Sequence, residues 1–594
     1  MRWFKRGVLA GALALAVCGP ASAQFTNIYF LGDSLTDVGA FKPLLPPGTG
    51  LFTTNPGPVY PTLVAAQYGF TATPATTGGN DFAQGGARVS QLPGFGSGPT
   101  VNAIPVTTQV GQLLARGPLD PNALYVVWAG ANDVFTQISA AGAGAITAAQ
   151  AQAGVSQAAT DLVGQLARLQ ANGARYIVVI NLPDIGRTPA GVASGQPATF
   201  TGLSSLFNST FIAGMDQAGV QALRLNVFGL LNEIIANPGL YGFSNVTVPA
   251  CGATSSLVCT AANLVAPNAA QTFLFADGVH PTTAGHAVIA QYIEATLVAP
   301  QQIAALAEAP LNVDRATFRS LDSRMVSAIN APGRGKYEAW ATYDYANPDM
   351  KSGFLTGDGT LDTLSVGFDA KVTQRLLVGA AFAYTDDKVD FSQSGFKLRD
   401  TTGTLYAGYG EGPWYIGATL GASDLDYRDV HRDITLGAAT RTERGDTKGY
   451  ATTGRVLAGY WFNLGSNIVH GPRVAYTYQD ITVRAYSEQG SASTTMSFDQ
   501  QRRKSGVTSL GWQVAGTFGA FRPFLRASWE NETKDDVRSV GASVFGTGAG
   551  GFSVPAYKPD KNYALFTVGA STDLGRVTAF VTGSGTGGKS DGND

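Results

Sequence analysis

The chain has 594 residues, of which 14% are charged and 74 are glycine, and its formal net charge is -2. Globular proteins average about 25% charged residues and about 7% glycine, so this chain is poor in charge and rich in glycine. The composition excludes a coiled coil, and a hydrophobic content of 44% excludes charge-driven disorder. A net charge so close to zero argues against nucleic-acid binding, which needs a basic surface.

Residues 1–23 are predicted to form a signal peptide. Residues 2–6 carry positive charge, residues 8–17 are apolar, and residues 21–23 (ASA) form a small-x-small cleavage site. The apolar stretch is shorter than the ~20 residues that span a bilayer, so we expect export rather than anchoring. No later apolar run reaches the ~18 residues of a membrane-spanning helix, so none is expected.

Two cysteines, Cys251 and Cys259, remain after the predicted cleavage. An even number of cysteines in an oxidising compartment predicts a disulfide that closes one loop. A pair of free, buried thiols is the alternative.

Residues 24–309 are predicted to form an α/β domain. Short, continuously apolar runs are typical of strands buried on both faces, and they lie at residues 26–31, 124–128 and 176–181. Helical patterns cover residues 148–170, 206–236 and 283–309. Alternation of strands and helices predicts a parallel sheet that helices cover.

Residues 310–335 are amphipathic and are predicted to form a helical linker. This helix could occupy the lumen of a barrel or lie on the surface between two domains. From residue 336 to 594, apolar residues alternate with small or polar residues in segments of about ten residues. Trp414, Ile416 and Leu420, for example, share one face. About eleven such segments, rich in aromatic residues, predict an all-β transmembrane barrel, with a soluble β-sandwich or up-and-down barrel as the alternative.

The number of segments bears on the end of the chain. Bacterial outer-membrane barrels have an even number of strands, so eleven segments suggest about twelve strands. We therefore expect the sequence to stop short of a last strand, and a miscount by one is the alternative.

The segment Gly32-Asp33-Ser34-Leu35 directly follows the first predicted strand. Ligands of open α/β folds bind at the carboxyl edge of the sheet, which is where this turn would place Ser34. There Ser34 could act as an attacking hydroxyl, with nearby backbone N–H groups facing an oxyanion. Taken alone, the segment reads more simply as an ordinary turn.

A serine nucleophile needs a base and a carboxylate that orients the base. Between residues 24 and 335 the candidate bases are His280 and His286. Asp277 lies three positions before His280 in a glycine-containing loop, which favours His280, whereas His286 reads as a packing or surface residue of the following helix.

Two further segments could donate hydrogen bonds to an oxyanion. Asn132 follows the strand at residues 124–128, so its amide would lie at the same sheet edge as Ser34. Gly85 and Gly86 would let the backbone approach a ligand closely. An ordinary turn is the alternative for both segments.

Together, these four segments resemble the GDSL (SGNH) family of serine esterases and lipases. The resemblance covers about residues 25–300 and implies a flavodoxin-like α/β/α fold. It implies Ser34 as nucleophile, His280 as base and Asp277 as the residue that orients His280. It further implies an oxyanion hole made of the Ser34 N–H, the Gly85 N–H and the Asn132 side chain. Gly86 is the alternative to Gly85, because the sequence has Asp81 where many relatives have Asn. No metal or organic cofactor is needed for this chemistry.

The whole chain resembles an autotransporter esterase, in which a catalytic domain, a helical linker and a barrel of roughly twelve strands follow one another. The resemblance implies a monomer in the outer membrane of a Gram-negative bacterium, with the catalytic domain at the cell surface. Its partners would be an ester or lipid substrate, the outer-membrane bilayer and the barrel assembly machinery, and no nucleic acid. An inactive surface adhesin on the same barrel is the alternative, and the acyl-chain length of the substrate stays open.

Overall fold

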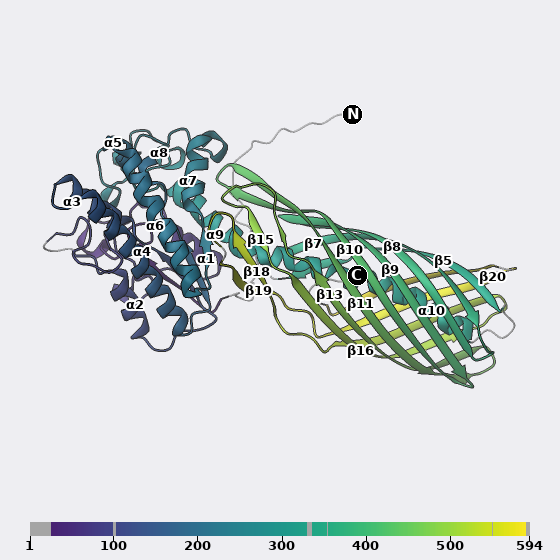
Figure 1. Cartoon of the computed structure of the whole chain (residues 1–594). Coiled ribbons are helices and arrows are strands. Elements are labelled where there is room, and N and C mark those ends of the chain that lie inside the picture. The colour runs from purple at the N-terminus through teal and green to yellow at the C-terminus, as the bar shows by residue number, and fades with distance from the viewer. Residues whose placement is uncertain are drawn as a thin grey trace, which may run out of the picture.

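The computed structural model describes residues 25–98, 102–329, 336–352, 355–548, 550–575 and 577–589. The predicted signal peptide, the end of the predicted linker at residues 330–335 and residues 590–594 lie outside this range. The described chain forms an N-terminal α/β domain, which we call the passenger, and a C-terminal β-barrel (Figure 1). In the described ranges, no helix is both long enough and apolar enough to cross a membrane.

A parallel sheet forms the centre of the passenger, with its strands in the order β1-β2-β3-β4. All five residues of β2 are buried and apolar, because helices cover both faces of the sheet. The three predicted strands are confirmed to within two residues at each end. The strands are β1 (Ile28–Gly32), β2 (Leu124–Trp128), β3 (Tyr176–Ile180) and β4 (Leu223–Leu225).

The helices complete an α/β/α architecture, with α1, α7 and α9 on one face of the sheet and α2, α3, α4 and α6 on the other. The α-helices are α1 (Tyr60–Gln67), α2 (Val106–Leu114), α3 (Ala131–Gly142), α4 (Ala148–Ala171), α5 (Pro189–Ala193), α6 (Pro197–Ala218), α7 (Val227–Ala236), α8 (Ala269–Thr272) and α9 (Thr283–Ala304). Short 3₁₀ helices are η1 (Lys42–Leu44), η2 (Ala75–Thr77), η3 (Ile185–Arg187), η4 (Pro238–Tyr241), η5 (Ser256–Val258), η6 (Ala261–Asn263) and η7 (Ala305–Ala307).

The helical pattern predicted over residues 206–236 is wrong in its middle part. Helix α6 ends at Ala218, and Gly219 closes it in the left-handed conformation with φ 64°. Strand β4 follows and buries Leu223 and Leu225 in the sheet before α7 begins. A strand of three residues is too short to interrupt a helical pattern of apolar residues in the sequence.

Helix α9 leaves the passenger and continues through η7 into α10 (Ala309–Ile329). Figure 1 shows α10 inside the barrel. There the Thr453 hydroxyl donates to Asp314 of α10 at 2.8 Å, and Arg455 pairs with Asp322 at 2.9 Å. Of the two positions considered for the linker helix, the structure therefore has the one in the lumen.

The barrel is an antiparallel sheet in which eleven strands of the described chain follow one another, with β5 and β21 at its two edges. This number agrees with the eleven segments of the sequence pattern. The strands are β5 (Tyr337–Ala346), β7 (Leu355–Lys371), β8 (Leu376–Phe391), β9 (Ser394–Glu411), β10 (Trp414–Leu436), β11 (Ala439–Tyr460), β13 (Ile468–Val483), β16 (Gln501–Gly516), β17 (Phe521–Glu532), β20 (Asn562–Leu574) and β21 (Val577–Gly587). The short strands β6 (Asp349–Ser352) and β12 (Phe462–Leu464) pair with β7 and β13.

The two faces of the barrel wall differ as the pattern predicts. Trp414 and Leu420 of β10 are 44% and 67% exposed on the outer face, whereas Tyr415 between them is 1% exposed and bonds to Gln513 across the lumen. An apolar outside and a polar lumen are typical of an outer-membrane barrel.

Several strands extend beyond the bilayer and reach the passenger. Strand β10 has 23 residues, whereas a strand needs about 9–11 residues to cross a membrane. At the tip of the β10–β11 hairpin, Gly437 N–H donates to Gln291 of α9 at 2.7 Å and Ala438 N–H donates to Tyr241 at 3.2 Å. A second, small sheet between the domains consists of β14 (Tyr486–Ser487), β15 (Met496–Phe498), β18 (Arg538–Val544) and β19 (Phe552–Tyr557).

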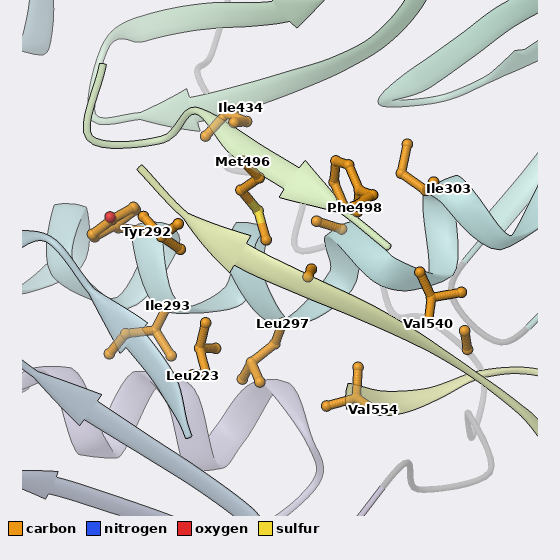
Figure 2. Close-up of a cluster of buried hydrophobic side chains, with 14 of the residues drawn as sticks. Leu223, Tyr292, Ile293, Leu297, Ile303, Ile434, Met496, Phe498, Val540 and Val554 are labelled. Carbon is orange, nitrogen blue, oxygen red and sulfur yellow. The ribbon is translucent and has the colours of Figure 1, made fainter. Parts of the chain in front are cut away.

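Passenger and barrel share one hydrophobic core at this junction. Ile293 and Leu297 of α9 belong to the same buried cluster as Phe498 of β15, Val540 of β18 and Val554 of β19, and Figure 2 shows these side chains between the helix and the strands. The small sheet thus packs on the helix that leads into the barrel.

Candidate active site

Ser34 lies just after β1, at the carboxyl edge of the parallel sheet. The turn needs Gly32, because a Cβ atom there would lie 2.1 Å from the Trp128 carbonyl oxygen of the adjacent strand. The side chain of Gln109 bonds to both backbone groups of Gly32. Gln109 Oε1 accepts the Gly32 N–H at 2.9 Å, and Gln109 Nε2 donates to the Gly32 carbonyl oxygen at 2.8 Å. The backbone that presents Ser34 is therefore fixed on both sides.

The three residues predicted to act together do meet in the structure. His280 Nε2 lies 2.8 Å from Ser34 Oγ, and His280 Nδ1 lies 2.9 Å from both carboxylate oxygens of Asp277. Asp277 also accepts the backbone N–H groups of Val279 and Ser256, at 3.0 and 2.9 Å. This is the geometry of a nucleophile, a base and an orienting carboxylate.

The carboxylate of Asp277 also sets the charge state of this pair. Burial raises the pKa of Asp277, but the His280 ring and the donated N–H groups outweigh burial, so the pKa lies well below its usual range. Burial lowers the pKa of His280, but the adjacent Asp277 charge outweighs it, so the His280 pKa is raised above 6.5. Asp277 thus stays ionised and favours a protonated His280.

The second histidine, His286, lies in α9 and has a structural place. Its Nδ1 accepts the Tyr60 N–H at 3.3 Å, and its Nε2 lies 3.4 Å from the Phe52 carbonyl oxygen. Burial lowers the pKa of His286 to about 3, so the ring is neutral. The structure therefore brings His280, not His286, to Ser34.

Asn132 lies in the first turn of α3, directly after β2. Its Nδ2 donates one hydrogen bond to the Ala87 carbonyl oxygen at 3.0 Å, which leaves the second amide hydrogen for another acceptor. The contact ties Asn132 to the segment that contains Gly85 and Gly86.

Gly85 and Gly86 differ in what their N–H groups do. Gly85 N–H donates to Asp37 Oδ2 at 2.9 Å, so it is already used. Gly86 takes the left-handed conformation with φ 87°, and in the described hydrogen bonds its N–H has no acceptor. The geometry therefore favours Gly86, the alternative considered above, as the glycine that can face a ligand.

Sequence reasoning missed several side chains that surround the site. Asp37 and Asp81 are buried carboxylates in the segments of Ser34 and Gly85. The Phe52 ring covers His280, with ring centroids 5.0 Å apart. Asp37 lies three residues after Ser34 and Asp81 four residues before Gly85, but nothing in their local pattern indicates a contact between the two segments, and no local signal marks Phe52.

Cys251 and Cys259 are bonded to each other, with their Cα atoms 5.9 Å apart. The loop that this disulfide closes contains Ser256, which donates its N–H to Asp277. The disulfide is therefore part of the surroundings of the candidate site.

Comparisons with known proteins agree with both halves of this architecture. A family model described as GDSL-like Lipase/Acylhydrolase matches residues 28–293, and one described as Autotransporter beta-domain matches residues 339–584. The chain is 30% identical over 592 residues to an uncharacterized protein in the trpE-trpG intergenic region of Pseudomonas putida, covering 92% of this chain and 95% of that protein.

Two further relatives are named for hydrolytic activity. Esterase EstA of Pseudomonas aeruginosa is 28% identical, and the match covers 93% of this chain and 92% of that protein. Lipase 1 of Photorhabdus luminescens is 26% identical, with 94% and 93% covered. The chain therefore belongs to the GDSL family of autotransporter esterases, ester hydrolases of the outer membrane in which a GDSL-like domain precedes an autotransporter β-barrel.

Proposed function

We propose that this chain is a serine carboxylesterase that acts through an acyl-enzyme, with Ser34 as nucleophile, His280 as general acid–base and Asp277 as the orienting carboxylate. The observation that carries the proposal is the chain of contacts from Ser34 Oγ through both ring nitrogens of His280 to Asp277. A carboxylate at Nδ1 favours the tautomer with a proton there, which leaves the Nε2 lone pair for the Ser34 hydroxyl.

In the first step, His280 Nε2 takes the proton of Ser34 while Oγ bonds to the ester carbonyl carbon. His280 then gives that proton to the leaving alkoxide as the C–O bond breaks, which releases the alcohol and leaves an acyl-Ser34. In the second step water replaces Ser34 as the attacking group. His280 takes one proton from the water and returns it to Ser34, which releases the carboxylic acid.

We assign the oxyanion hole to the Ser34 N–H, the Gly86 N–H and the second amide hydrogen of Asn132. Gly86 is preferred to Gly85, because the Gly85 N–H would first have to leave Asp37. Removing one such donor typically costs about 10²–10³ in kcat. The Asn132→Ala variant should therefore lose most of its turnover while its fold stays intact.

The passenger is proposed to face the outside of the cell, after export by the predicted signal peptide. Helix α9 begins three residues after His280 and runs for 22 residues toward the barrel, about 33 Å at 1.5 Å per residue. Ser34, which contacts His280, thus lies beside the start of α9, the end of this helix that is farther from the barrel lumen. Hydrolysis of a membrane-impermeant ester by intact cells tests this orientation.

Replacement of the nucleophile tests the mechanism. We expect Ser34→Ala to lose turnover by orders of magnitude and to resist labelling by a fluorophosphonate probe. Ser244→Ala, an exposed serine in the same domain, is the matched control and should behave like the wild type. Near-normal hydrolysis by Ser34→Ala would overturn the mechanism, and an unlabelled, inactive wild type would favour a surface adhesin.

A further inference from the structure

Three phenylalanine rings form a row beside the candidate oxyanion hole. The Phe95 ring lies 5.4 Å from the Phe135 ring, and Phe135 lies 6.3 Å from Phe200, measured between centroids. Phe95 is 42% exposed whereas Phe200 is buried at 8%, so the row runs from the surface into the passenger. An exposed phenyl ring at the open end of such a row offers apolar surface to a ligand.

The row is attached to the two groups that we assign to the oxyanion hole. Phe95 N–H donates to the Gly86 carbonyl oxygen at 2.8 Å, so its backbone lies directly beside that glycine. Phe135 lies three residues after Asn132 on α3, and residues three apart project from the same helix face. A carbonyl oxygen bound by Gly86 and Asn132 therefore lies next to the start of the row.

The helix before the one that contains Phe200 contacts the segment of His280. Helix α6, which contains Phe200, follows α5, and Ala190 of α5 donates its N–H to the Gly278 carbonyl oxygen at 2.8 Å. The buried end of the row, at Phe200, packs in the passenger core.

The chemistry of ester cleavage decides which part of the substrate the row contacts. The leaving alcohol must lie beside His280 Nε2, because His280 protonates it. The Phe52 ring covers that side of the site, packed against both His280 and the position of Gly85. The acyl group is bonded to the same carbon but points away from the leaving alcohol, and so away from His280 and Phe52.

We propose that Phe95 and Phe135 form the acyl-binding surface of the enzyme, so that it prefers esters of apolar acyl chains several carbons long over acetyl esters. This inference rests on the proposed function of Ser34 and adds the class of acyl group. Burial of each methylene of the chain would raise kcat/KM about fourfold, until the chain extends past the rings.

The test compares p-nitrophenyl acetate, butyrate, hexanoate and octanoate as substrates of the full chain in detergent. We expect kcat/KM of the wild type to rise along this series. Phe95→Ala and Phe135→Ala should lower the ratio of octanoate to acetate turnover on the order of tenfold, because only the longer chain reaches the surface that they remove. Leu240→Ala, an exposed apolar residue outside the row, is the control and should keep the wild-type ratio.

Phe95 is exposed enough that its removal should leave the fold intact, and Phe135→Leu provides a second, milder change. An octanoate-to-acetate ratio that stays at the wild-type value in Phe95→Ala, or an equal loss on all four esters, would overturn the acyl-binding surface. Failure of the catalytic proposal is distinguishable, because it would appear as ester turnover by Ser34→Ala, whatever the acyl length.

Discussion

Asp37 and Asp81 exchange hydrogen bonds between the two loops that carry the nucleophile and the glycine pair. Asp37, from the Ser34 loop, accepts the Gly85 N–H at 2.9 Å, and Asp81, from the glycine loop, accepts the Val38 N–H at 2.8 Å. Both carboxylates are 1% exposed, and neither takes part in an ion pair of the described residues. Buried carboxylates with only backbone donors are costly, so their position between the loops indicates a positioning role.

Replacement of Asp37 by Asn should impair turnover through the glycine loop. The amide oxygen of Asp37→Asn can still accept the N–H groups of Gly39 and Ala40, but its NH₂ group then faces the Gly85 N–H. A lost bond and an unsatisfied donor cost about 1–3 kcal/mol. We expect kcat to fall about 10- to 100-fold with little change in KM, measured on a short-chain ester.

Asp120→Asn is the matched control for this variant. Asp120 lies before β2, at the sheet edge opposite Ser34, and it also accepts a backbone N–H, from Asn122 at 2.8 Å. Its kcat should equal that of the wild type. A wild-type kcat in Asp37→Asn would show that the glycine loop holds its position without this carboxylate.

The pH dependence of hydrolysis should report the Asp277–His280 pair. His280 acts as a base only when neutral, and its raised pKa places the acidic limb of kcat/KM above pH 6.5. Asp277→Asn removes the charge that favours imidazolium, so the His280 pKa falls and the limb moves to lower pH, while kcat drops by orders of magnitude. If the acidic limb of Asp277→Asn stays at the wild-type pH, the limb does not report the ionisation of His280.

The raised pKa of His280 affects stability and hydrolysis in opposite directions: it favours the folded state at low pH, where hydrolysis is slow. A group whose pKa is higher in the folded state contributes stability below its unfolded pKa and loses that contribution as the pH rises through the folded pKa. The contribution of His280 is thus fully present below pH 6.5 and disappears above it, where hydrolysis is fastest.

The sequence carried enough information for β1, β2 and β3 of the passenger sheet, but not for β4, and for the three residues around Ser34. Buried parallel strands are visible as apolar runs, and with two histidines in the passenger, the position of Asp277 was enough to select His280. The contact of Gly85 with Asp37 could not be predicted, because it joins residues 48 apart and depends on how two loops fold against each other. The junction core was hidden for the same reason, since Phe498 and Leu297 are distant in the chain.

The disulfide should support both stability and turnover. Its loop presents the Ser256 N–H to Asp277 at 2.9 Å, and the Cys259 carbonyl accepts the Asn55 N–H at 3.0 Å. Replacing Cys251 and Cys259 by Ser should lower the free energy of unfolding by about 2–3 kcal/mol for a loop of this length. Thermal inactivation measured with and without a reductant checks this. The reductant should speed the thermal inactivation of the wild type and leave that of the double variant unchanged. A wild type whose thermal inactivation is the same with and without reductant contradicts the prediction.

Phe498 should stabilise the junction between the passenger and the barrel. Its ring is buried in the junction cluster, lies 5.4 Å from the Tyr486 ring, and packs with the residues of α9 shown in Figure 2. Phe498→Ala leaves a cavity that costs about 3–5 kcal/mol in a well-packed core. We expect faster proteolytic cleavage at the junction in the full chain, with kcat on a soluble ester unchanged, because Ser34 lies at the far end of α9.

Phe518→Ala, in the exposed turn between β16 and β17, is the matched control and should be cleaved at the wild-type rate. Equal protease resistance of Phe498→Ala and Phe518→Ala would mean that the small sheet does not hold the passenger, and that its orientation depends on α9 and α10 alone.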